Sequence, residues 1–221
     1  MSRASVATLL TAAAWIASAA PAPALARAVP TGYGKGPGYC ALYGSIASRY
    51  SFDGVYACAT TSSFGPTPFD ADDTESFQCV ELSARFLWAI YGIWAGPGTG
   101  VQSGANLVSV VHRLNPRLRV ATPSPRSVPL AGDIVSLGPG GAVDRRFGHT
   151  GVVRSASRRR GTFTVIGQNF PPGRAGEQTL TVDLRGRHNG RARVNGVWTA
   201  TSWLELRVRP KQPRHRDAGS R

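Results

Sequence analysis

Cys79 is the residue of this sequence best placed to act as a nucleophile. The stretch from Cys79 to Tyr91 contains no Gly or Pro, and its apolar residues recur at spacings of two to four, which predicts a helix with a broad buried face. Ser76 is the expected N-cap. At the start of a helix the unpaired N–H groups and the dipole favour a thiolate, so we expect the pKa of Cys79 to be lowered. The alternative is an inert, buried cysteine that packs as a small hydrophobe.

His149 and Asn169 are the expected partners of this thiol. His149 stands at the start of a predicted strand, and Asn169 follows the next strand along the chain, residues 162–168. The start of one antiparallel strand lies beside the end of the next, so the two side chains are expected to be neighbours.

These residue types together suit amide cleavage. A thiolate would attack a carbonyl carbon, and an imidazole would take the thiol proton and later give it to the leaving amine. A third polar group would fix the orientation of the ring. The main-chain N–H of Cys79, helped by the Gln78 side chain, would stabilise the oxyanion. This chemistry needs no cofactor, and the sequence has no Cys/His cluster with metal-ligand spacing.

Helices come first in the predicted elements that must hold these residues, and short strands follow. A second helix is expected over residues 105–114, and the connection after it is rich in proline. Five strands are expected, over residues 133–137, 149–154, 162–168, 179–184 and 202–208. This order predicts an α+β fold in which the helices pack on an antiparallel sheet of about five strands.

The first 26 residues have the features of a signal peptide. Arg3 precedes an apolar run from Val6 to Ala20, and Ala24 to Ala26 form a small-residue cleavage site. We therefore expect a secreted, periplasmic or wall-associated protein with no membrane span in its mature chain. The expected organisation is a signal peptide (1–26), a flexible and possibly disulfide-pinned segment (27–69), a catalytic domain (70–208) and a basic disordered tail (209–221).

Export affects the interpretation of the three cysteines, because an odd number cannot pair completely within one chain. Cys40 and Cys58 lie in a segment with little apolar content, which a disulfide could hold together. Cys79 would then remain as the free thiol. A different pairing, with Cys40 or Cys58 free, stays open.

The net charge of +14 and the pI of about 11.1 predict attraction to polyanions. Anionic cell-wall polymers fit an exported protein. Nucleic acid is disfavoured, because the sequence has no recognisable basic helix and no aromatic and basic stacking face. The length fits one domain, and we expect a monomer.

Three segments in this order resemble the CHAP family, the cysteine- and histidine-dependent amidohydrolases and peptidases of the papain-like and NlpC/P60-like group. They are Phe77–Glu81, then Pro129–Val135 with Gly148–Val153, then Val165–Phe170. The resemblance implies a papain-like CHAP fold, with Cys79 as nucleophile, His149 as general base and acid, and Asn169 as a polar site residue. It also implies cleavage of amide bonds in bacterial peptidoglycan.

One position departs from the family pattern. Many CHAP members carry an acid two positions before the asparagine, and this sequence has Gly167 there. Either Asn169 orients His149 or the site is weakened. Asp133 is a poor substitute, because a turn or capping role at a strand entrance explains it better.

The sequence thus predicts a secreted peptidoglycan hydrolase that is either an N-acetylmuramoyl-L-alanine amidase or a peptide endopeptidase. The alternative is a non-catalytic protein that binds cell wall or polyanions and retains the CHAP fold.

Overall fold

The computed structural model describes most of the chain between residues 29 and 206. The described residues are 29–30, 32–59, 67–70, 78–122, 127–138, 147–169, 176–188, 191–195 and 199–206, with the backbone alone from 176 to 201. The predicted signal peptide, the predicted N-cap Ser76 and the predicted tail lie outside them.

A seven-stranded sheet with the order β3-β9-β4-β5-β6-β7-β8 forms the larger part of the fold, and every neighbouring pair is antiparallel. Its strands are β3 (Arg119–Ala121), β4 (Ile134–Gly138), β5 (His149–Ser157), β6 (Thr162–Gly167), β7 (Gly176–His188), β8 (Arg191–Asn195) and β9 (Thr199–Glu205). The predicted α+β class is confirmed, and the five predicted strands are β4 to β7 and β9. The other two, β3 and β8, were not predicted, because one has three residues and charged side chains interrupt the apolar pattern of the other.

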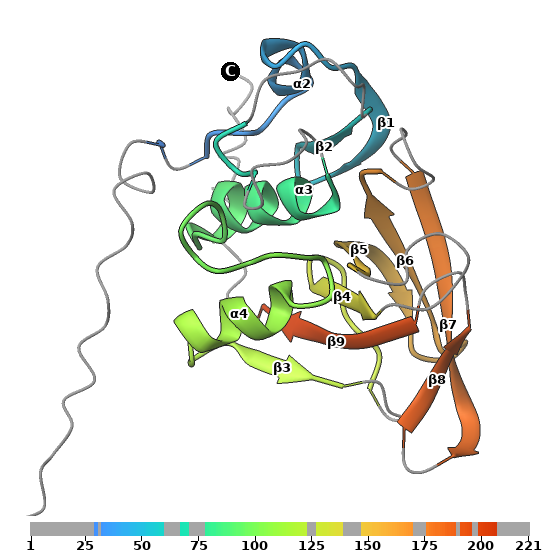
Figure 1. Ribbon diagram of the computed structural model, residues 1–221. Helices are drawn as coiled ribbons and strands as arrows, with labels where there is room; N and C mark the ends of the chain where they lie inside the picture. Colours follow the sequence, from blue (N-terminus) through green and yellow to red (C-terminus); the bar gives the residue numbers. More distant parts are fainter. Residues whose placement is uncertain are drawn as a thin grey trace, which may run out of the picture.

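Two helices cover one face of this sheet (Figure 1). Helix α3 (Cys79–Phe86) continues as a π-helical turn, η1 (Leu87–Tyr91), and ends at Gly92, whose φ of 67° places it in the left-handed region. Helix α4 (Leu107–Leu114) packs against β4 and β9, while α3 packs against β5 and β6. The helix expected over 79–91 is therefore present. No helix among the described residues is long and apolar enough to cross a bilayer.

The N-terminal segment joins the same core. Helix α2 (Gly38–Leu42) precedes a two-stranded sheet of β1 (Ala47–Phe52) and β2 (Val55–Cys58). A disulfide links Cys40 to Cys58. Tyr39, Val55 and Phe69 are buried in one cluster with the apolar face of α3. We expected a flexible, possibly disulfide-pinned segment before residue 70; its described part carries the Cys40–Cys58 disulfide and packs on α3 through aromatic side chains.

Candidate active site

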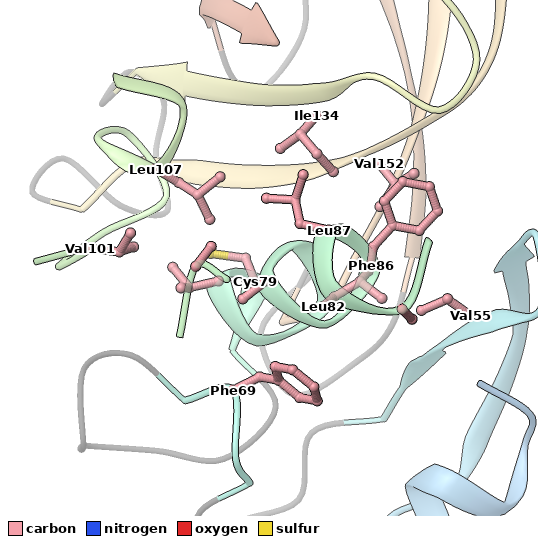
Figure 2. Close-up of a cluster of buried hydrophobic side chains, with 14 of the residues drawn as sticks. Val55, Phe69, Cys79, Leu82, Phe86, Leu87, Val101, Leu107, Ile134 and Val152 are labelled. Carbon is pink, nitrogen blue, oxygen red and sulfur yellow. The ribbon is translucent and has the colours of Figure 1, made fainter. Parts of the chain in front are cut away.

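Cys79 is the first residue of α3 and the free cysteine of the chain. The preceding residue, Gln78, occupies the N-cap position with extended backbone angles and makes no capping bond through its side chain. Figure 2 shows the Cys79 side chain in the apolar cluster beside Val101 and Leu107. Cys79 is only 9% exposed, and its neighbours in this cluster are apolar. Cys79 therefore stands at the start of its helix, as the sequence predicts, in a largely buried position.

Two buried hydroxyl groups hold α3 against β5. The Oγ of Ser83 lies 3.2 Å from the Oγ1 of Thr150, and Thr150 Oγ1 donates to the main-chain O of Val135 at 2.8 Å. Ser83 follows Cys79 by one helical turn on the same face, and Thr150 is the residue next to His149. These bonds therefore fix the helix start near the strand start.

His149 is the first residue of β5 and is buried. The turn before α4 packs closely on its backbone: a Cβ at Gly104 would collide with the main chain of His149. The main-chain N of Ala105 donates to the O of Phe147 at 3.1 Å. Gly148 has a φ of 61°, a conformation that a residue with a Cβ adopts only with strain. The turn before α4 thus packs directly on the backbone of His149.

The imidazole of His149 lies directly over Gly167, the last residue of β6. A Cβ built at Gly167 would be 2.6 Å from His149 Nε2, which is closer than real Cβ contacts come. The ring therefore occupies the space above the position where many CHAP members carry an acid. Because Gly167 offers only backbone there, no carboxylate from this position reaches the ring.

Asn169 follows Gly167 by two residues and contacts the N-cap residue of α3. Its Nδ2 donates to the Oε1 of Gln78 at 2.6 Å, and its φ of 55° is in the left-handed region, which Asn tolerates better than most residues. This bond holds the Gln78 side chain next to Cys79. Residues 167–169 thus contact both the His149 ring, at Gly167, and the N-cap residue of α3, Gln78, through Asn169.

A buried ionic network behind the site was not predicted from the sequence. Glu81 and Arg85 form an ion pair at 2.7 Å with both side chains fully buried. Tyr39 donates to Glu81 at 2.9 Å, and the Arg85 guanidinium lies 4.3 Å from the centroid of the Tyr39 ring. Burial and the negative charge of Glu81 raise the pKa of Tyr39 well above its ordinary value. The i,i+4 spacing of Glu81 and Arg85 was the available signal, although such pairs usually lie on exposed faces.

Two other titratable residues lie apart from the site. Asp133 accepts hydrogen bonds from the main-chain N of Leu130 at 2.8 Å and of Leu206 at 3.2 Å. Burial raises the pKa of Asp133 to about 6, with a smaller contribution from the charge of Glu205, and the two backbone bonds oppose the shift. The ring of His112 contacts the O of Leu118 at 2.9 Å. Asp133 thus has the turn role that the sequence favoured.

The described residues contain no group of three or more His, Cys, Asp or Glu side chains that could hold a metal ion.

Residues 70–169 match the family described as the CHAP domain. This part of the chain is therefore similar to a CHAP domain. The match begins before α3 and ends at Asn169, so it includes Cys79 and His149. CHAP domains form a family of hydrolytic amidases and peptidases that act on cell-wall peptidoglycan. The search of curated proteins found no match.

Proposed function

We propose that this protein is a secreted peptidoglycan hydrolase that cleaves an amide bond with Cys79 as nucleophile. The observation that carries the proposal is that the ends of three secondary-structure elements lie near one another within the residues that match the CHAP family. They are the N-terminus of α3 at Cys79, the start of β5 at His149 and the end of β6 before Asn169. The bond would be either the link between the muramoyl lactyl group and L-alanine or a bond within the peptide.

In the first half of the reaction, His149 takes the proton of the Cys79 thiol. The helix N-terminus favours the resulting thiolate. The sulfur attacks the substrate carbonyl carbon, and a C–S bond forms while the electron pair of the C=O bond moves to oxygen. The main-chain N–H of Cys79 and the Gln78 amide would donate to this oxyanion. The C–N bond then breaks as the imidazolium of His149 gives its proton to the leaving amine.

In the second half, water hydrolyses the thioester. His149 takes a proton from the water while the water oxygen attacks the acyl carbon. The C–S bond then breaks, which releases a carboxylic acid and regenerates the Cys79 thiolate. Because Nε2 of His149 lies against Gly167, we assign Nδ1 to the proton exchange with Cys79. Asn169 would act through Gln78, since its amide donates to Gln78 Oε1.

The basic charge supports an anionic wall as the place of action. Arg154 on β5 and residues 158–160, three consecutive arginines in the turn after it, are exposed. Teichoic-acid-like polymers carry repeated phosphates that such a cluster can bind at low salt. Retention on walls that persists unchanged in 1 M salt would exclude this contribution.

The absence of an acid at Gly167 favours one other candidate, a protein that binds cell wall without cleaving it. The two functions differ in the products released from purified peptidoglycan. Mass spectrometry after digestion should show new amino termini or free peptides with the wild type and none with Cys79→Ala. If neither protein releases products while both remain bound to walls, the binding function is the better one.

A further inference from the structure

Gln168 lies between the two halves of the candidate site and is completely buried. It follows Gly167, against which the His149 ring packs, and its own side chain points toward α3. There its Nε2 donates to the main-chain O of Gln78 at 3.2 Å. That carbonyl also accepts the first hydrogen bond of the helix, from the N of Glu81 at 3.1 Å. A single side chain thus connects the strand end under the imidazole to the residue that precedes Cys79.

The amide of Gln168 is held in this orientation by three further hydrogen bonds. Its Nε2 donates to Glu81 Oε2 at 2.8 Å, and its Oε1 accepts from the main-chain N of Cys58 at 2.7 Å and from Arg85 Nη2 at 3.0 Å. Two donations and two acceptances use the full pairing capacity of one amide. The donor and acceptor ends of Gln168 therefore cannot exchange without breaking all four bonds.

The ion pair that holds this amide is poorly explained by stability alone. Both side chains of Glu81 and Arg85 are fully buried, and removing two charges from water costs about as much as their attraction returns. A buried pair of this kind is better explained where it fixes one geometry. Here it fixes the amide of Gln168, which contacts the N-cap of the catalytic helix.

We propose that Gln168 is a positioning residue that sets the distance between the Cys79 thiol and the His149 imidazole. The inference rests on the proposed function, because it assigns these two groups to the reaction. Thiolate formation depends on the separation of the negative sulfur from the positive ring, and a misplacement of about 1 Å in a reacting pair can cost about 100-fold in rate. The side-chain hydrogen bonds of Gln168 go to Gln78, Glu81, Cys58 and Arg85, so we infer that it acts through Gln78 and the backbone of Gly167.

The test replaces Gln168 with methionine, which keeps the length and removes the four hydrogen bonds. Cys79 is the single free thiol, so its alkylation by iodoacetamide can be followed across pH without other substitutions. The midpoint of this profile should rise toward that of an ordinary thiol, about pH 8.5. Peptidoglycan hydrolysis should lose about 10- to 100-fold in kcat with a smaller change in KM. A folded Gln168→Met protein with the wild-type alkylation profile would overturn the proposal.

Tyr39→Phe is the matched control. It removes one hydrogen bond to Glu81 from the same buried network but no contact of Gln168. Its melting temperature should fall while its alkylation profile stays at the wild-type position. If Tyr39→Phe displaces the profile as much as Gln168→Met does, the network acts as general support and Gln168 has no special role.

A charge exchange covers the case in which Gln168→Met does not fold. Gln168→Glu alone places a second carboxylate beside Glu81, and adding Glu81→Gln restores one carboxylate, one amide and one guanidinium. The new carboxylate at position 168 still accepts from Cys58 and Arg85 but cannot donate to Gln78. The double variant should therefore regain thermal stability relative to Gln168→Glu, with its alkylation profile still displaced. Recovery of both properties would refute the positioning role.

These measurements also separate this inference from the proposed function. If the wild-type protein releases no peptidoglycan products, the hydrolase proposal fails. The alkylation profiles still show whether Gln168 controls the ionisation of Cys79.

Discussion

Gly167→Ala is the sharpest perturbation of the candidate site, because it adds one methyl group directly under the His149 ring. The new Cβ would lie 2.6 Å from Nε2, whereas ordinary contacts begin near 3.4 Å. The ring must therefore move by roughly 1 Å, a displacement that can lower the rate of a positioned pair by about 10- to 100-fold, or 1.4 to 2.7 kcal/mol of activation free energy.

Stability should change much less than activity in this variant. Gly167 is not among the glycines with positive φ, so alanine suits its backbone and reduces the entropy of the unfolded chain. Gly38→Ala is the matched control, since a Cβ there meets nothing within 4 Å.

Peptidoglycan hydrolysis, Cys79 alkylation and thermal unfolding should be measured on Gly167→Ala, Gly38→Ala and the wild type. Wild-type hydrolysis and alkylation by a folded Gly167→Ala protein would refute the reasoning, because the imidazole would then not depend on its place over Gly167.

Three further predictions concern the scaffold. Replacing Cys40 and Cys58 with serine should lower the free energy of unfolding by about 3 kcal/mol, the chain-entropy value for their separation of 18 residues, and denaturant titration without reductant measures it. An unchanged denaturation midpoint would mean that the disulfide adds no constraint to the unfolded chain. The pKa of Asp133 is about 6 in the folded protein, against an ordinary value of 3.8, so folding favours the uncharged carboxyl group. Its contribution to stability is therefore present below about pH 4 and is lost as the pH rises through 6. Stability should therefore fall by roughly 3 kcal/mol over that window in the wild type, and Asp133→Asn should remove this fall; equal slopes in both proteins would contradict the assignment. Ser83→Ala removes the hydroxyl contact to Thr150 and should cost about 1 kcal/mol of stability in chemical denaturation, whereas a cost near zero would show that apolar packing alone holds α3 to β5.

The sequence carried enough local information to predict the elements that position the site. The absence of Gly and Pro after Cys79 indicated α3, and the order of strands indicated that the start of β5 lies beside the end of β6. These are properties of periodicity and of antiparallel pairing, which depend on neighbouring residues.

The buried network could not be predicted in the same way. Gln168 contacts Cys58 across 110 positions and Glu81 across 87, and such contacts arise only after the N-terminal segment packs on α3. The position of the His149 ring over Gly167 was also inaccessible, because a glycine gives no sequence signal of what lies above it. The resemblance to CHAP sequences marked this position as unusual, and the geometry shows that the His149 ring fills it.

If the protein is secreted, as we propose, the short β1–β2 hairpin has a consequence for its maturation in an oxidising compartment. Cys58 lies 18 positions from Cys40 and 79 − 58 = 21 positions from Cys79, so loop entropy favours the native pair by only about 0.1 kcal/mol. A chain that formed a Cys58–Cys79 disulfide instead would have no free thiol at position 79, the proposed nucleophile.

The hairpin turn gives the native pair an advantage that loop length does not. Asp53 and Gly54 have φ of 48° and 81°, the backbone of a tight two-residue turn that forms locally and early. Ala47 then pairs with Cys58, which brings Cys58 toward α2 and Cys40 before α3 needs to dock. The hairpin of the N-terminal segment thus favours the pairing that leaves Cys79, the proposed nucleophile, outside the disulfide.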